Sequence, residues 1–167
     1  GGYVGAEDRS WGKTGYGFYS VSMKAASCPG VISSFFIYNG FPWDEIDIEF
    51  LGDDTTKVQF NYYKNGVGGH EFVYDLGFDA SKEFHRYGFR WTADSITWFV
   101  DGVPVYKVTT NKNATTGTNL RVVDKLPSTA GRMLTNYWCG NERAWGWMGQ
   151  YTGAVKDQGT EYQWIAT

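Results

Sequence analysis

Hydrophobic and polar positions alternate over many short segments of this chain, and a helical period is almost absent. The alternating runs, rich in β-branched and aromatic residues and separated by turn-forming residues, predict strands. They lie near 16–24, 31–38, 44–50, 57–63, 71–75, 85–91, 95–101, 103–109, 132–138 and 161–165. Strands at such close spacing are typical of an all-β sandwich or barrel. No repeat, linker or second domain is evident, so we expect a single domain over residues 1–167.

Turn signals separate several of these strands. Asp101-Gly102 lies between two alternating runs and predicts a tight hairpin. Asn39-Gly40 and the glycine-rich residues 66–69 predict loops. Residues 110–130 are rich in Thr, Asn, Gly and Ser and have few apolar positions, so we expect one long loop-like insertion there.

The clearest alternation is that of acidic and apolar residues over residues 44–50. Side chains along a strand alternate between two faces, so Glu45, Asp47 and Glu49 stand in one row. The opposite face, directed into a core, carries Ile46, Ile48 and Phe50. Three carboxylates in a row repel one another, and a merely solvated charged face usually mixes signs, whereas this row has no Lys or Arg. Paired carboxylates of unequal pKa are what the cleavage of a glycosidic bond requires.

The next predicted strand has a polar and aromatic face made up of Lys57, Gln59, Asn61 and Tyr63. Neighbouring antiparallel strands place such rows side by side, so we expect Asn61 and Tyr63 to flank the carboxylates. A similar row near the C-terminus consists of Leu134, Asn136 and Trp138. A buried Asn needs hydrogen-bond partners, and sugar hydroxyls can supply them. These rows therefore favour a saccharide groove over a purely apolar core.

Composition supports this interpretation. Aromatic residues make up 19% of the chain, with 8 Trp, 12 Tyr and 11 Phe, and flat rings stack well on the apolar faces of sugars. The net charge of -3 argues against a nucleic-acid or anionic-membrane surface. No apolar run reaches the roughly 18 residues that span a bilayer. The chain begins at Gly1 without Met or a signal-type segment, which we interpret as a mature or trimmed product.

Cys28 and Cys139 are the only cysteines, and no Cys-x-x-Cys spacing suggests metal or redox chemistry. One disulfide would stabilise the fold by about 4–5 kcal/mol in the chain-entropy model. Two unpaired buried thiols are the alternative, and the sequence leaves both open because the geometry is not visible.

A retaining glycosidase needs a nucleophilic carboxylate and a protonated carboxylic acid about 5–5.5 Å apart. The Cα atoms of Glu45 and Glu49 are roughly 13 Å apart on a flat strand. The two side chains must therefore lean together over Asp47 on a concave sheet. In that arrangement we expect Asp47 to hydrogen-bond one glutamate while its charge raises the pKa of the other.

Residues 43–52, Trp-Asp-Glu-Ile-Asp-Ile-Glu-Phe-Leu-Gly, resemble the active-site strand of glycoside hydrolase family 16. The similarity continues through 55–63, 65–71 and 76–81, covers most of residues 6–165, and favours the lichenases, the endo-1,3-1,4-β-glucanases. The resemblance implies an antiparallel β-sandwich, a concanavalin A-like jelly roll with a concave substrate cleft. It also implies a secreted, extracellular enzyme that acts on β-glucan and needs no cofactor.

By this resemblance Glu45 is the nucleophile, Glu49 the general acid/base and Asp47 the assisting carboxylate. The residues that match substrate-binding positions are Glu7, Arg9, Tyr38, Trp43, Asn61, Tyr63, Asn136 and Trp138. Taken singly, Glu7 and Arg9 could form an ordinary surface ion pair, and each aromatic residue could be core. The joint match favours the cleft.

The sequence departs from the family pattern at three places. The usual strands upstream of Glu7 are absent, so we expect the domain to be incomplete or permuted there, with a second fragment or a rearrangement covering the exposed edges. Gln163 stands where lichenases often carry a calcium-binding Asp, so we expect no metal at that site. The insertion around residues 110–124 could lengthen or cap the cleft.

Three functions follow from these observations. The first is retaining endo-hydrolysis of mixed-linkage 1,3-1,4-β-glucan. A xyloglucan-type glucan transferase shares the acidic strand, but the loop at 65–69, Asn-Gly-Val-Gly-Gly, favours the lichenase. A catalytically impaired β-glucan-binding fragment is the third, and the complete set of carboxylates argues against it because binding alone needs none.

Overall fold

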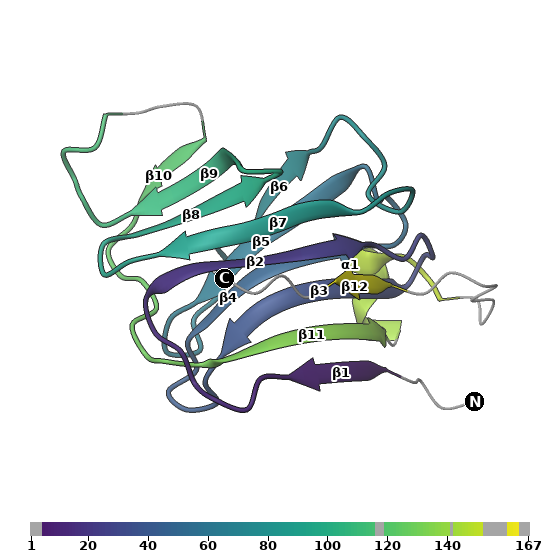
Figure 1. Ribbon diagram of the computed structural model, residues 1–167, viewed down its shortest axis with the longest axis horizontal. Helices are drawn as coiled ribbons and strands as arrows, with labels where there is room; N and C mark the ends of the chain where they lie inside the picture. The colour runs from purple at the N-terminus through teal and green to yellow at the C-terminus, as the bar shows by residue number, and fades with distance from the viewer. Residues whose placement is uncertain (1–4, 116–118, 141, 152–159, 164–167) are drawn as a thin grey trace.

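The protein is an all-β sandwich of two six-stranded sheets that pack face to face (Figure 1). The computed structural model describes residues 5–115, 119–140, 142–151 and 160–163. Within these residues there are twelve strands and one short helical segment. The predicted all-β sandwich is therefore confirmed.

The first sheet contains the acidic strand near its centre. Its order is β1 (Ala6–Arg9), β11 (Arg132–Cys139), β3 (Val31–Tyr38), β4 (Glu45–Leu51), β5 (Lys57–Tyr63) and β6 (Phe72–Asp75). All its neighbouring pairs are antiparallel. Because β4 has a partner on each side, its backbone is held along almost its whole length.

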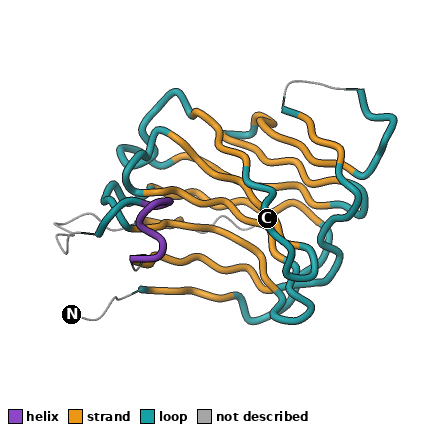
Figure 2. The backbone as a smooth tube through the Cα atoms, turned by 180° about the vertical axis from the view of Figure 1, so that it is seen from behind, coloured by secondary structure: helices purple, strands orange, loops and turns teal. Residues whose placement is uncertain are grey.

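The second sheet covers the inner face of the first. Its order is β10 (Leu120–Val122), β9 (Val103–Thr109), β8 (Ser95–Val100), β7 (His85–Trp91), β2 (Gly17–Lys24) and β12 (Glu161–Gln163). All pairs are antiparallel except β10 with β9. The helical segment, η1 (Glu142–Ala144) and α1 (Trp145–Met148), follows β11 and lies near one end of the strands (Figure 2).

The core fills the space between the sheets, as the alternation along β4 predicts. The inward-facing residues of β4 are fully buried there: Ile46, Ile48 and Phe50. Burying such side chains stabilises the fold by about 1.5–3 kcal/mol each. Ring contacts join the two layers, with Phe60 5.6 Å from Trp98 and Phe50 4.8 Å from Tyr87 between ring centroids. The inward face of β4 is therefore fixed, which leaves its acidic residues to the outward face.

Two tight turns show why glycine is needed at particular positions. Asp101 and Gly102 join β8 to β9 with φ values of 48° and 80°, which confirms the predicted hairpin. Asn65 and Gly66 form a similar turn, with φ values of 51° and 78°. Glycine adopts a positive φ at no steric cost, so it suits the second position of both turns.

Two strands were not predicted from the sequence. Residues 110–130, expected to be a loop, include β10, which pairs with β9 in parallel. At the other edge, β1 has the sequence Ala-Glu-Asp-Arg and is exposed throughout. Both segments are too short to show a strand period on their own, and each is a strand because it pairs with a longer neighbour.

Cys28 and Cys139 are both free thiols, so of the two states considered the structure has the unbonded one. In the part of the chain that the structure describes, no helix is both long enough and apolar enough to span a bilayer.

The side chain of Asp44 connects two loops with the start of β4 through an ion pair and hydrogen bonds. Its side chain is 1% exposed and lies 2.9 Å from the Lys64 ammonium. It also accepts hydrogen bonds from the backbone amides of Asn65, Ser128 and Thr129 at 2.8–3.1 Å. Burial opposes the charged form, but the backbone amides and Lys64 together hold the pKa of Asp44 below its usual value. This buried carboxylate therefore stabilises the native state.

We expect Asp44→Asn to lower the free energy of unfolding by about 3 kcal/mol, because it leaves the Lys64 ammonium without its anionic partner. Urea denaturation measures this loss. Since the pKa of Asp44 is lower in the native state, its contribution is complete above the unfolded pKa of about 3.9 and disappears as the pH falls through the native value.

Asp124→Asn is the matched control. Asp124 pairs with Lys112 at 3.8 Å, and the two side chains are 89% and 79% exposed. Its loss should change stability by less than about 0.5 kcal/mol. Equal effects of the two substitutions would contradict the anchoring role of Asp44.

Candidate active site

Three carboxylates form a row on the outward face of the first sheet, which we call the carboxylate face. Glu45, Asp47 and Glu49 all lie on β4, and their neighbours in sequence fill the core. Glu45 and Glu49 are partly buried, and Asp47 is 2% exposed. The structure therefore places the predicted carboxylates together, in a setting where their charges act strongly on one another.

The strand register builds one transverse row around each carboxylate. Across β3, β4 and β5 the rows are Tyr38–Glu45–Tyr63, Phe36–Asp47–Asn61 and Ser34–Glu49–Gln59. Asn61 and Tyr63 therefore flank the carboxylates, as the sequence predicts. Asn61 also donates a hydrogen bond from its side chain to Glu71 at 3.4 Å.

Aromatic side chains surround Glu45. The indole N–H of Trp43 donates a hydrogen bond to the Glu45 carboxylate. The Trp43 ring stacks on Tyr63, with centroids 4.9 Å apart and planes 12° apart. Tyr38 meets Trp43 edge to face at 6.3 Å. Because 42% of the Trp43 surface is exposed, this cluster offers a flat apolar platform beside a carboxylate.

The surroundings of Asp47 favour its protonated form. Burial raises the pKa of Asp47 well above its usual value, and the charges of Glu45 and Glu49 raise it further. Burial also raises the pKa of Glu45, but hydrogen bonds from Asp47 and Trp43 oppose this effect. The pKa of Asp47 is therefore shifted further toward the protonated form than that of Glu45, which favours Glu45 as the ionised member of the pair.

Burial and the charge of Glu45 raise the pKa of Glu49 to about 7. Gln59 opposes this shift, because its side-chain amide donates a hydrogen bond to Glu49 at 3.1 Å. The expectation that the charge of Asp47 raises the pKa of a neighbouring glutamate needs correction. Besides burial, the charges that raise the pKa of Glu49 are that of Glu45 and, to a smaller extent, that of Glu71.

The remaining predicted residues extend the carboxylate face toward β1. Asn136 of β11 accepts a hydrogen bond from the Ser34 hydroxyl, and Glu7 lies opposite Asn136 in the register. Arg9 pairs with Glu7 at 2.7 Å on the exposed edge strand. Trp138 lies opposite Ile32, one row beyond Glu49. All eight predicted substrate-binding residues therefore lie on the first sheet or on the loop that enters β4.

Three residues next to the carboxylates were not predicted as site residues. Gln59 contacts Glu49, and its position on the same face as Asn61 was a sufficient signal. Glu71 lies in the segment before β6 and raises the pKa of Glu49. Trp147 of α1 donates its indole N–H to Gln59 at 3.1 Å. No pattern in the sequence connects Glu71 or Trp147 with β4.

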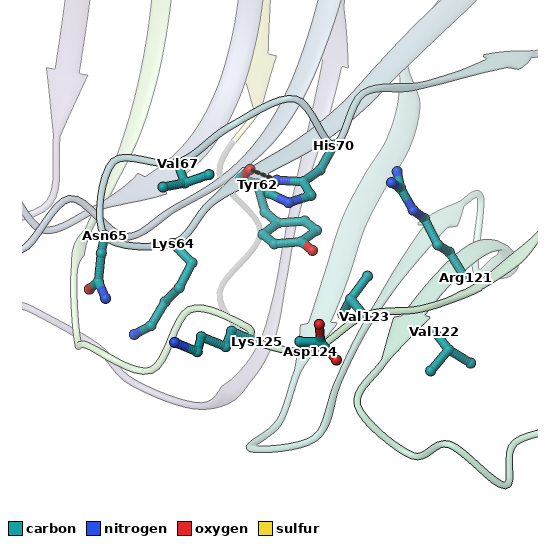
Figure 3. A pocket seen from close by; sticks show the side chains of 10 residues that line it. All are labelled: Tyr62, Lys64, Asn65, Val67, His70, Arg121, Val122, Val123, Asp124 and Lys125. Atoms are coloured by element: carbon teal, nitrogen blue, oxygen red, sulfur yellow. Dashed lines mark hydrogen bonds between the residues drawn. The ribbon is translucent and has the colours of Figure 1, made fainter.

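A separate cavity of about 530 Å³ lies beside the loop at 64–70 (Figure 3). Its charged lining residues are Lys64, Arg121, Asp124 and Lys125. Tyr62 also lines it and has Ile46, an inward-facing residue of β4, as its register partner, so the cavity lies away from the carboxylate face. The lining residues offer no pair of carboxylates. Among the described residues, no three or more His, Cys, Asp or Glu side chains are grouped to hold a metal ion.

Comparison with known proteins gives the family of this chain. The family model "Glycosyl hydrolases family 16" matches residues 3–164. A beta-glucanase of Acetivibrio thermocellus is 48% identical over 170 residues, and one of Paenibacillus macerans is 51% identical over 164 residues. A crystal structure of a prokaryotic beta-1,3-1,4-glucanase (lichenase) from a mouse hindgut metagenome superposes with a TM-score of 0.78 at 48% identity.

These matches cover nearly all of this chain but only part of each relative. The two alignments span 98% and 96% of this chain, and 45% and 62% of the Acetivibrio and Paenibacillus proteins. The structural match covers 89% of this chain and 64% of the lichenase. The sandwich is thus the jelly roll of these enzymes.

The charge interaction between the two glutamates can be measured directly. We expect Glu45→Gln to lower the pKa of Glu49 by about one unit, because it removes the charge that disfavours ionisation of Glu49. Carboxyl carbon NMR titration of labelled protein reads this value without any need for turnover.

Glu71→Gln is the matched control, since Glu71 makes the smaller contribution to the same shift. It should lower the pKa of Glu49 by less than Glu45→Gln does. If the pKa of Glu49 is the same in Glu45→Gln as in the unaltered protein, burial alone sets it and the coupling described above is wrong.

Proposed function

The chain belongs to glycosyl hydrolases family 16, and from that premise we propose that it hydrolyses internal bonds of mixed-linkage 1,3-1,4-β-glucan with retention of configuration. In this proposal Glu45 is the nucleophile, Glu49 is the general acid/base and Asp47 assists Glu45. The enzyme acts outside the cell, where its polymeric substrate is found.

The observation that carries the proposal is the unequal protonation of two glutamates on one strand. Burial raises the pKa of Glu45, but hydrogen bonds from Asp47 and Trp43 favour its ionised form, which suits a nucleophile. Glu49 has a pKa of about 7, so at slightly acidic pH most of it is protonated and can donate a proton. Retaining glycosidases need this division of roles between two carboxyl groups.

The reaction then proceeds in two steps. A Glu45 oxygen attacks the anomeric carbon while Glu49 gives its proton to the departing glycosidic oxygen, which leaves a glycosyl ester on Glu45. Glu49, now ionised, removes a proton from water, and the resulting hydroxide equivalent attacks the anomeric carbon. The ester bond breaks, Glu45 regains its charge, and Glu49 is protonated again. Two inversions give net retention.

The surroundings of the carboxylates suit a glucan chain. Tyr38, Trp43 and Tyr63 provide the aromatic platform beside the nucleophile, where a pyranose ring can stack. Asn61 and Asn136 supply side-chain amides for sugar hydroxyls on either side of β4. We assign the more distant Glu7, Arg9 and Trp138 to neighbouring sugar units, because they lie toward β1 on the same sheet.

The linkage preference rests on the relatives. The Acetivibrio and Paenibacillus proteins are named beta-glucanases, and the superposed lichenase is named a beta-1,3-1,4-glucanase. A glucan transferase or a glucan-binding fragment would use the same face of the sheet. The unequal glutamates favour catalysis over binding alone, since a binding surface gains nothing from two coupled carboxyl groups.

We expect release of reducing sugar from barley β-glucan and lichenan, and none from laminarin or carboxymethylcellulose. Glu45→Gln and Glu49→Gln should each reduce kcat on the order of 10³-fold or more, because each removes a group that acts in the transition state. Proton NMR of the first product should show the β-anomer.

The outcomes separate the candidate functions. Direct appearance of the α-anomer would overturn the retaining mechanism. Transfer to an added oligosaccharide in preference to water would support the transferase. Glucan binding without turnover, unchanged by Glu45→Gln in protein that is folded by circular dichroism, would support the binding fragment.

The pH dependence of kcat/KM should follow the two glutamates. Glu49 must be protonated for the first step, so the alkaline limb should fall near its pKa of about 7. Loss of activity on the acidic side should follow protonation of Glu45. An alkaline limb that stays in place in Glu71→Gln would contradict the assignment to Glu49, since Glu71 helps to raise that pKa.

A further inference from the structure

A chain of two hydrogen bonds connects the helical segment with Glu49. The indole N–H of Trp147 donates to Oε1 of Gln59 at 3.1 Å. The side-chain N–H of Gln59 then donates to Oε2 of Glu49, also at 3.1 Å. Gln59 lies beside Glu49 in the sheet register, whereas Trp147 reaches it from α1, 88 residues further along the chain.

The chemistry of these groups determines which atom donates and which accepts in both hydrogen bonds. An indole N–H can donate but cannot accept, so it is satisfied only by the carbonyl oxygen of the Gln59 amide. That leaves the NH₂ group of Gln59 to face Glu49. A carboxylate accepts this hydrogen bond in its ionised form, whereas a protonated carboxyl group would prefer a carbonyl oxygen as its partner.

We propose that Trp147 is a positioning residue that fixes the side-chain amide of Gln59 with its NH₂ group toward Glu49, so that Glu49 can return to its ionised form in the second step of the reaction. The inference rests on the proposed function. Without the indole N–H, the Gln59 amide is free to rotate by a half-turn and present its oxygen to protonated Glu49. The neutral acid would then be favoured over the base.

The hydrogen bond from Gln59 favours ionised Glu49, and several other charged or titratable groups also face Glu49. From its own strand, Glu45 and Asp47 face it, and Glu71 faces it from the segment before β6. Charged or titratable groups on the same face of the neighbouring strand and its preceding loop are Tyr63, Lys57 and Asp54, with Lys57 paired to Asp54 at 2.8 Å. The helical segment itself contributes Arg143. Burial, Glu45 and Glu71 raise the pKa of Glu49, and the hydrogen bond from Gln59 lowers it.

Trp147 could instead serve only as a stacking surface for sugar. Its side chain is 41% exposed beside a cavity of about 310 Å³ that Lys57 and Val73 also line. The two roles differ in what they need from the residue. Stacking uses the ring, whereas positioning uses the single N–H, so a substitution that keeps an aromatic ring and removes the N–H separates them.

Trp147→Phe is that substitution, and Trp145→Phe is its matched control. Trp145 lies on the same helix, and its buried indole N–H makes no hydrogen bond within the described structure. Carboxyl carbon NMR should show the pKa of Glu49 rising by about half to one unit in Trp147→Phe and staying unchanged in Trp145→Phe. The alkaline limb of kcat/KM should move upward by the same amount.

Gln59→Met provides the second arm. It removes both hydrogen bonds and keeps the length of the side chain, so it should also raise the pKa of Glu49, because the donor to the ionised carboxylate is lost. Adding Trp147→Phe to Gln59→Met should then cause no further shift, because Trp147 acts through Gln59. Circular dichroism and thermal melting establish that each variant is folded, and Gln59→Met keeps the test available if Trp147→Phe is not.

An unchanged pKa of Glu49 in Trp147→Phe, with KM alone increased, would overturn the proposal and leave Trp147 as a stacking surface. A further shift in the double variant would overturn it too, because Trp147 would then act by another route. The NMR titration needs no turnover, so it still decides the positioning role if the protein hydrolyses none of the glucans tested.

Discussion

Three carboxyl groups placed side by side on a sheet and shielded from water cannot all be ionised, and this electrostatic constraint governs the arrangement of the carboxylate face. Asp47, the most buried of the three, has its pKa raised well above the usual value, and its hydrogen bond with Glu45 favours the ionised form of Glu45. Glu45 keeps its charge because Asp47 and Trp43 both donate to it. Burial together with the charge of Glu45 raises the pKa of Glu49 to about 7. Three chemically similar groups thereby acquire pKa values raised to different extents.

The core of the sandwich makes this arrangement possible. Residues on the inward face of β4 are fully buried against the second sheet, so the acidic residues cannot turn inward without exposing them. The indole N–H of Trp98, from the second sheet, also donates to the backbone carbonyl of Asp47 at 3.1 Å. Packing on one side of β4 therefore holds the carboxyl groups on the other side in place, and Gln59 and Trp147 adjust the last of them.

Much of the fold and of the site could be predicted because it depends on short-range pattern. The alternation over residues 44–50 gives both the strand and its two faces, and the Asp101-Gly102 turn gives the hairpin between β8 and β9. Asn61 and Tyr63 could be placed beside the carboxylates since a hairpin neighbour has a predictable register. The short strands β1 and β10 could not be predicted from the sequence, because their stability comes from pairing with a longer strand.

The sequence by itself determined the all-β class, the acidic row and most of the polar and aromatic residues that share its sheet. Only the tertiary structure decided how the pKa of each carboxyl group is shifted, and it assigned the charge that acts on Glu49 to Glu45 in place of Asp47. It also brought Trp147 to Gln59. The physical reason is the distance along the chain over which each property is determined. Alternation along a strand is a local property of the backbone, whereas a pKa depends on burial and on charges and donors that distant parts of the chain supply.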